Sequence, residues 1–235
     1  MITFFKTTIY TPLYNILVAL TAAIPSHDLG LAIVLLTLGV KTALAPLQYQ
    51  ASRSQQKIKS LEPHLNKIKQ DHKDNRELQA QKIMELYKEH NFNPFGSILP
   101  LFIQIPIILS LFYIARSGFD LSVVHLYSFT PLPTTINTNF LGFLDINGRN
   151  LWLAIMVAVS QFIFAWLTPR LGGDNNQDFA RAMDLQMRYV LPLLIGFTAH
   201  LLPAAVSLYW VTSNLFSIGY ELFRRASQPT LTTVR

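Results

Sequence analysis

Apolar residues along this chain gather in long runs that match the length of membrane-spanning helices. Leu29–Leu47 has 19 residues, roughly 28 Å as a helix, which is close to the thickness of the hydrocarbon core of a bilayer. Phe95–Ala115 and Leu151–Leu167 are two further apolar runs, and neither of these two contains a charged residue. Tyr189–Tyr220 stays uncharged over 32 residues, about 48 Å as a helix, which is too long for one upright span.

Charged residues are concentrated in one segment. Gln48–Pro94 carries nine Lys or Arg and six Asp or Glu, which is 15 of the 32 charged residues of the chain. Loops rich in Lys and Arg stay in the cytoplasm, which places this segment and Thr168–Arg188 inside. Gly118–Gly148 contains no Lys or Arg and therefore belongs outside. The basic pair Arg224–Arg225 also belongs inside, and this requires two crossings that meet in a turn at Pro203.

These patterns predict an all-α integral membrane protein with a five-span core over residues 29–225, its N-terminus outside and its C-terminus inside. The spans are expected at about 29–47, 95–115, 151–168, 185–202 and 204–223. Residues 48–94 are expected to form a cytoplasmic helical hairpin, because Leu and Ile recur at helical spacing on both sides of Asp74–Asn75. Its first helix is expected to be kinked or restarted at Pro63, and residues 226–235 to form a short tail.

The first 28 residues combine apolar side chains with several threonines and Asn15, and Pro12 interrupts them. This mixture is typical of an amphipathic helix lying in the membrane interface, which we predict for residues 1–28. The alternative is a signal peptide, with Ile16–Ile24 as its apolar centre and a weak cleavage candidate at residues 21–23.

The composition agrees with residence in a membrane. Hydrophobic residues make up 51% of the chain and charged residues 14%, against about 25% charged in a soluble domain. Cysteine is absent, which excludes a disulfide, a thiolate metal site and a cysteine nucleophile. The net charge of +6 fits basic loops facing anionic lipid better than specific binding of nucleic acid.

Enzyme motifs are lacking. The chain has no HExxH, P-loop or GxGxxG sequence, so we expect no enzyme activity, no cofactor and no metal site. His200 and Ser207 lie in or near predicted spans and leave an intramembrane serine protease as an alternative. Neither residue has a nucleophile motif around it.

Four polar side chains lie deep in the predicted spans. Gln104, Gln161 and Asn214 fall near the midpoints, and Lys41 falls three residues past the midpoint on the cytoplasmic side. A lysine at the centre of a span costs about 2.5–3.5 kcal/mol, so such groups normally face protein or water. The alternatives are that Lys41 extends toward the cytoplasm, that the amides bond between helices, and that Trp210 serves packing.

Four stretches carry motifs that are specific in combination. Asn93–Ile107 has the proline-marked sequence NPFGSILPLFIQIPI, and Leu202–Asn214 has the sequence LPAAVSLYWVTSN. Tyr87–His90 at the end of the hairpin and Gly30–Val34 at the start of the first span fit the same pattern. Over about Leu29–Arg225, the chain resembles the YidC/Oxa/Alb family of membrane protein insertases, in its short bacterial form.

The resemblance implies a multi-pass insertase and chaperone of the bacterial inner (plasma) membrane that inserts newly made membrane proteins and helps them fold. Members use no nucleotide or cofactor, and their core helices enclose a hydrophilic groove open to cytoplasm and lipid. The implied partners are nascent membrane proteins and membrane lipid, with the ribosome and the Sec translocon as candidates.

The resemblance also assigns residues to the groove. Members have one basic residue on the first core helix, and the matching residue here is Lys41. Gln161 and Trp210 match groove-lining positions, and we add Gln104 and Asn214 for their depth. The apolar residues expected to guide the substrate are Ile155, Phe162, Leu208 and Phe216.

The chain departs from the family pattern in several places. Members usually have arginine at the position of Lys41, and an ammonium group lacks the bidentate donor fork and loses its proton more readily when buried. Ala205 stands where the family often has glycine. The tail is short, which argues against ribosome tethering by a long basic tail, and no large outer domain is expected. The alternative function is a small-solute transporter or channel, although no internal repeat supports it.

Overall fold

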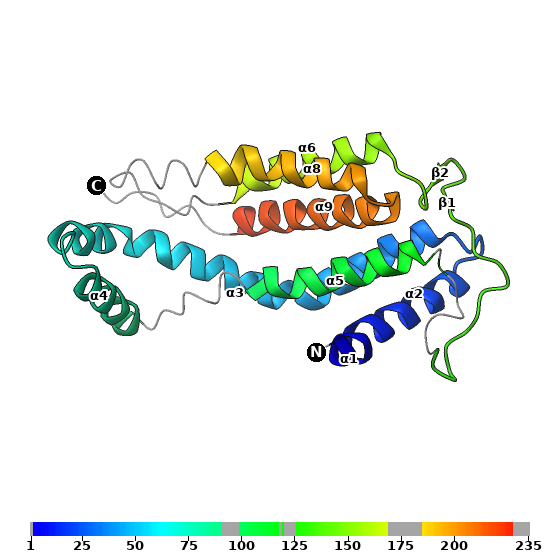
Figure 1. Cartoon of the computed structure of the whole chain (residues 1–235), viewed down its shortest axis with the longest axis horizontal. Coiled ribbons are helices and arrows are strands. Elements are labelled where there is room, and N and C mark those ends of the chain that lie inside the picture. The colour runs from blue at the N-terminus through cyan, green and yellow to red at the C-terminus, as the bar shows by residue number, and fades with distance from the viewer. Residues whose placement is uncertain (1, 91–98, 118, 120–125, 169–184, 228–235) are drawn as a thin grey trace. The chain divides into compact units, whose positions relative to one another are not determined.

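The computed structural model describes residues 2–90, 99–117, 119, 126–168 and 185–227 (Figure 1). The chain forms two compact units. The first unit contains Met1–Thr42, Pro106–Thr168 and Pro192–Arg235, and the second contains Ala43–Ile105 and Pro169–Leu191.

Helices account for most of the described residues. In chain order the elements are α1 (Ile2–Phe5), η1 (Lys6–Tyr10), α2 (Thr11–Ala23), α3 (Leu29–Asp71), α4 (Arg76–Glu89), α5 (Leu99–Arg116), β1 (Asn139–Phe140), β2 (Leu144–Asp145), α6 (Leu151–Leu167), η3 (Gln186–Val190), α8 (Leu191–Leu201) and α9 (Ala204–Ser227). The wider π-helical turns η1 and η3 continue into α2 and α8, because the joining residues keep helical backbone angles. β1 and β2 pair antiparallel, with Phe140 opposite Leu144.

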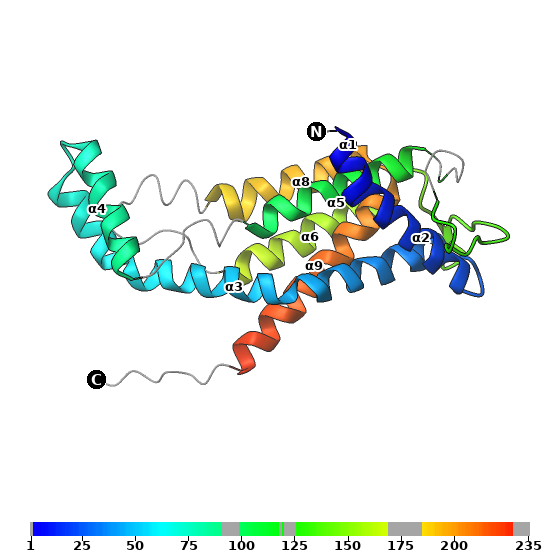
Figure 2. The same cartoon turned by 90° about the horizontal axis from the view of Figure 1, so that it is seen from below.

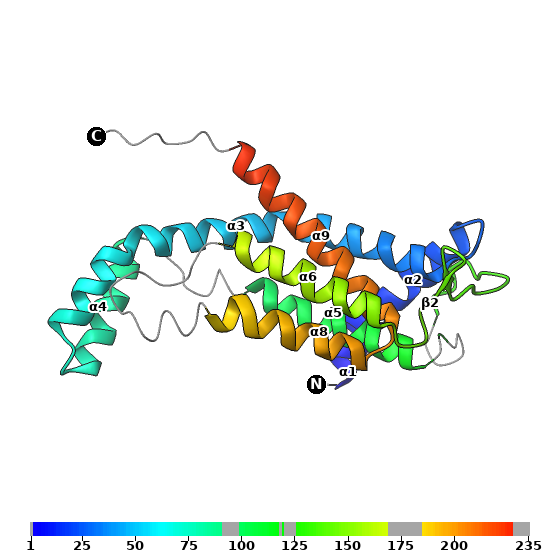
Figure 3. The ribbon, with the colours of Figure 1, turned by 90° about the horizontal axis from the view of Figure 1, so that it is seen from above.

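In the first unit, α6, α8 and α9 pack side by side (Figures 1 and 3). Their shared core consists of Ala154, Val157, Ala199 and Val211. Gly196 lets α8 approach α6 closely, since a Cβ atom there would lie 2.6 Å from the Cβ of Ala158. Small residues at crossing points are typical of helices that pack within a bilayer.

The N-terminal end of α9 is held by the segment that follows the β-hairpin. The main-chain N–H of Ala204 donates to the carbonyl of Gly148 at 2.7 Å, and that of Ala205 donates to Ile146 at 2.9 Å. The first N–H groups of a helix have no partner within the helix. These two bonds therefore fix where α9 begins.

The N-terminal helix is anchored in the first unit by Asn15, a residue of α2 that is 3% exposed. Its side-chain oxygen accepts from the Tyr127 N–H at 2.8 Å and from the Thr130 hydroxyl at 2.7 Å. Its side-chain nitrogen donates to the Thr11 carbonyl at 2.9 Å. One buried amide thus joins α2 to the segment after α5.

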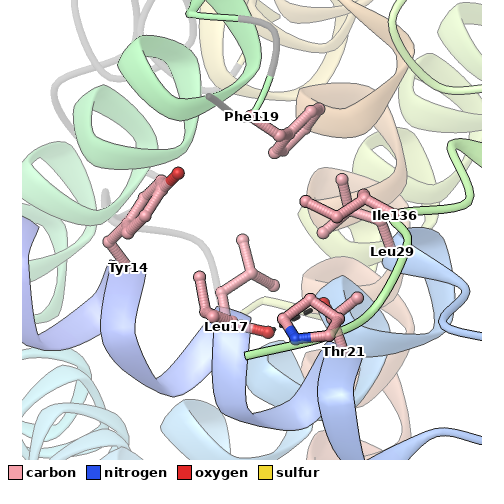
Figure 4. A pocket seen from close by; sticks show the side chains of 8 residues that line it. Tyr14, Leu17, Thr21, Leu29, Phe119 and Ile136 are labelled. Carbon is pink, nitrogen blue, oxygen red and sulfur yellow. Dashed lines mark hydrogen bonds between the residues drawn. The ribbon is translucent and has the colours of Figure 1, made fainter. Parts of the chain in front are cut away.

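A small apolar pocket lies beside this contact (Figure 4). Leu17 and Thr21 line it from α2, Leu29 lines it from the start of α3, and Phe119 and Ile136 line it from the segment between α5 and β1. The Thr21 hydroxyl donates to the Leu17 carbonyl at 2.8 Å and is already paired. The pocket is therefore a packing feature of the N-terminal segment.

His27 and Asp28 secure the junction between α2 and α3. One Asp28 carboxylate oxygen accepts from the Leu31 N–H at 3.0 Å and caps α3, and the other accepts from the Leu141 N–H at 2.8 Å. The His27 ring lies 3.1 Å from the Thr134 hydroxyl. The first helix of the predicted core therefore begins at a hydrogen-bonded joint.

In the second unit, the end of α3 and α4 form a helical hairpin. Its core consists of Leu61, Leu65 and Leu86. Asn75 caps α4 by accepting from the Leu78 N–H at 3.0 Å, so the second helix of the hairpin begins directly after Asp74–Asn75. On the surface, a 2.7 Å hydrogen bond from Lys82 to Glu85 lowers the pKa of the Glu85 carboxyl and raises the pKa of Lys82.

Of the kink or restart expected at Pro63, the restart is not seen, because α3 continues through Pro46 and Pro63 to Asp71. A proline removes one main-chain hydrogen bond, and a long helix tolerates that loss as a bend. α9 also runs past residue 223 to Ser227, while the predicted break at Pro203 separates α8 from α9.

Among the described residues, one helical segment is long and apolar enough to cross a membrane. It is Leu29–Ser54, with a mean hydropathy of 1.9. Phe102–Arg116 and Leu151–Leu167 are shorter apolar helices. The start of the second predicted span and most of the loop 168–188 lie outside the described residues, so the five-span core stays a prediction.

Candidate functional site

Polar side chains form a buried stripe along α9. Its members recur at steps of seven, three, four and three residues, which places them on one face of the helix. The residues of this α9 stripe are Ser207, Asn214, Ser217, Glu221 and Arg224, each at most 8% exposed. Because buried polar groups need partners, the contacts of the stripe determine what it can do.

Lys41 of α3 lies against the α9 stripe where the two helices cross (Figures 2 and 3). Its ammonium donates to the Ser217 hydroxyl at 3.4 Å, and that hydroxyl donates to the Ser213 carbonyl at 2.9 Å. A charge-assisted bond is normally about 2.7–2.9 Å long, so this contact is weak. Among the described residues, no carboxylate pairs with Lys41. The cation thus faces protein and retains donor capacity.

Asn214 joins α9 to α6. Its side-chain nitrogen donates to the Ser160 hydroxyl at 3.0 Å, and that hydroxyl donates to the Val157 carbonyl at 3.1 Å. Asn214 therefore forms a hydrogen bond between helices, as expected if its amide serves helix packing rather than lining a groove. Its role toward a substrate stays a prediction.

The other predicted groove residues occupy different settings. Gln161 of α6 is half-buried beside Ser160. Trp210 is half-buried and packs against the α6–α8–α9 core. Gln104 is half-buried in α5 and belongs to the second unit, whereas Lys41 belongs to the first. Within the first unit, Lys41 contacts α9.

The apolar residues predicted to guide a substrate differ in how exposed their side chains are. Ile155 and Phe162 on α6 are exposed, at 44% and 39%. Phe216 on α9 is half-buried. Leu208 is 5% exposed and belongs to the packed core, so in this conformation it offers no surface to a passing segment.

Glu221 is the polar residue of the predicted fifth span that sequence reasoning missed. Its carboxylate accepts from Arg224 at 2.9 and 2.5 Å and from Arg225 at 3.1 Å. The available signal was its spacing, because it follows Ser217 by four residues on the same face. Two arginines three and four residues later are suitably placed partners.

The pairing required for a serine protease is absent among the described residues. Ser207 is fully buried and its hydroxyl donates to the Ala199 carbonyl at 3.1 Å. The buried Nδ1 of His200 has no hydrogen-bond partner there. A nucleophilic serine needs a base within hydrogen-bond reach, so this geometry does not support the protease alternative. Within the described ranges, no three His, Cys, Asp or Glu residues gather to hold a metal ion.

Comparison with known proteins gives a consistent result. A sequence profile of the family described as "60Kd inner membrane protein" matches residues 20–230. A protein of Clostridium tetani named "Membrane protein insertase YidC" is 32% identical over 202 residues, which cover 86% of this chain and 83% of that protein. The protein of the same name from Fusobacterium nucleatum is 31% identical over 196 residues, covering 83% of this chain and 85% of its own length.

A longer relative matches a similar share of this chain. The protein named "Membrane protein insertase YidC" from Syntrophobacter fumaroxidans is 28% identical over 203 residues, which cover 83% of this chain and 34% of that protein. The family resemblance predicted from the proline-marked motifs is confirmed by these matches. The chain therefore belongs to the 60Kd inner membrane protein family, together with relatives that are named membrane protein insertases.

Proposed function

We propose that this chain is an insertase of the bacterial inner membrane that inserts newly made membrane proteins and helps them fold. Membership of the family supports both the function and the membrane. The contact of Lys41 with the α9 stripe carries the proposal, because it places a cation without a described carboxylate partner beside polar side chains. A bundle of purely apolar helices would not offset the free-energy cost of burying the charge of a lysine.

Five spans would enclose a hydrophilic groove open to cytoplasm and lipid, with Lys41 inside it. The cation would draw water and attract acidic residues of an incoming segment, which lowers the cost of moving their charge. Ile155 and Phe162 would pass the apolar part of that segment to lipid. Its transfer releases about 25 cal/mol for each Å² of apolar surface that leaves water. The ribosome and the Sec translocon are proposed as further partners.

The test is complementation in a host depleted of its own insertase, with insertion of a single-span substrate as the readout. The chain should restore insertion. Lys41→Arg should retain activity because it keeps the charge. Lys41→Glu should lower insertion about tenfold or more, since a reversed charge repels acidic substrates and costs at least ~1.4 kcal/mol.

Lys67→Ala is the matched control, because Lys67 is an exposed lysine of the same helix α3. It should insert like the unchanged chain. Equal activity of Lys41→Arg, Lys41→Ala and Lys41→Glu would exclude a role for the charge. Solute flux through liposomes without any insertion would favour the transporter instead.

A further inference from the structure

The C-terminal end of α9 carries a compact charged cluster. The Glu221 carboxylate is 6% exposed and accepts from Nε and Nη2 of Arg224, which is itself 8% exposed. The same carboxylate accepts from Nε of Arg225 at 3.1 Å. The Arg225 side chain is 47% exposed, so it is the accessible member of the cluster.

Arg225 also reaches a second helix. Its Nη2 donates to the carbonyl of Leu167, which is the last residue of α6. The last carbonyls of a helix have no partner within the helix and carry partial negative charge, so a guanidinium there is favourable. In Figure 3 the end of α9 turns away from α6, and a long side chain is needed to join them.

α6 and α9 are therefore joined at two places of different chemistry. Asn214 and Ser160 form a buried, neutral contact in the middle of both helices. Arg225 and the Leu167 carbonyl form a half-exposed, charged contact at the ends. Exposed charged pairs contribute little and are released easily, so the end contact can open while the middle contact holds.

We propose that Glu221 and Arg225, together with the Leu167 carbonyl, form a polar contact that we call the clasp. The clasp sets the distance between α6 and α9 at their C-terminal ends. This proposal rests on the proposed insertase function, because α6 and α9 carry the residues predicted to guide the substrate. Glu221 is the positioning residue, since it orients the guanidinium of Arg225 toward α6. Opening of the clasp widens the path by which an incoming segment enters between the two helices.

Distances between spin labels on α6 and α9 test the clasp directly, and the absence of native cysteine makes the labelling specific. Ile163→Cys with Leu222→Cys reports the end near the clasp. Val159→Cys with Leu215→Cys reports the region of the middle contact. All four side chains are exposed, so labels fit without disturbing the core.

The principal variant is Arg225→Gln, because the half-exposed Arg225 can be replaced while Arg224 keeps its carboxylate. We expect a longer and broader distance at the end pair and no change at the middle pair, because this variant removes only the contact at the ends of the two helices. Arg225→Lys should restore much of the distance, since a lysine still reaches one acceptor. Glu221→Gln should reproduce the effect of Arg225→Gln.

Glu77→Gln is the matched control, because it removes one exposed carboxylate from α4 and should leave both distances unchanged. Unchanged end-pair distances in Arg225→Gln would overturn the clasp, even where the unchanged chain inserts its substrate. A chain that fails to insert, yet shows the end-pair shift, would overturn the proposed function and leave the clasp intact.

Discussion

At the scale of single residues, depth in a span does not distinguish a structural amide from a functional one. Asn214 and Gln161 both lie near the middle of predicted spans. Asn214 is buried and bonded to Ser160, whereas Gln161 is half-buried and no contact among the described residues fixes its amide. The partner, rather than the residue type, separates their expected roles.

Alanine at these two positions should therefore differ in its effect on stability. Asn214→Ala leaves the Ser160 hydroxyl without its donor and should cost about 0.5–1.5 kcal/mol of stability. Gln161→Ala should leave stability unchanged and lower insertion, because it removes a predicted groove residue. Thermal unfolding in nanodiscs and the complementation assay measure the two quantities. Unchanged stability in Asn214→Ala would contradict the structural role of its bond to Ser160.

At the scale of elements, periodicity and turn residues predicted where helices lie in the chain better than they predicted which helices contact one another. The third run was expected at 151–168 and α6 spans Leu151–Leu167, because an uncharged run between polar residues has clear ends. Pro203 marks the break between α8 and α9. Partners such as Lys41 and Ser217 could not be predicted, since a pattern defines the faces of a helix but not its neighbours. Pro46 and Pro63 do not end α3, because a long helix can accommodate a proline as a bend.

The N-terminal helix is the element for which the sequence left two interpretations open. A signal peptide would be removed, but Asn15 of α2 makes two hydrogen bonds to the segment after α5. Tyr14 and Leu17, next to this anchor, are each 1% exposed. These contacts favour a retained helix that is part of the first unit.

Replacement of the anchor should loosen this helix. Asn15→Ala leaves the Tyr127 N–H and the Thr130 hydroxyl unpaired, which should cost about 1–3 kcal/mol and lower the unfolding midpoint by about 2–10 °C. Ile16→Ala is the control, because Ile16 is 49% exposed and should change the midpoint little. Intact mass of the purified chain checks retention. A mature protein that lacks the first 23 residues would contradict it.

At the scale of the whole molecule, the distribution of charge makes a prediction that helix lengths alone do not. Leu29–Ser54 is the one described segment that is long and apolar enough to cross a membrane. The five crossings depend instead on the basic loops and on α8 and α9, which meet at Pro203. A helix of 11 residues such as α8 spans roughly 17 Å, so η3 must extend it to cross.

Single cysteines in this cysteine-free chain can map the crossings. With a membrane-impermeant maleimide on intact spheroplasts, Thr8→Cys and Thr135→Cys should react, because the N-terminus and the segment before α6 are predicted outside. Ala80→Cys and Ala226→Cys should react only after permeabilisation, because basic segments remain in the cytoplasm. All four positions are exposed, so protection reflects the membrane and not burial in the protein. Reaction of Ala226→Cys from outside would mean that α8 and α9 do not both cross, and the five-span arrangement would be wrong.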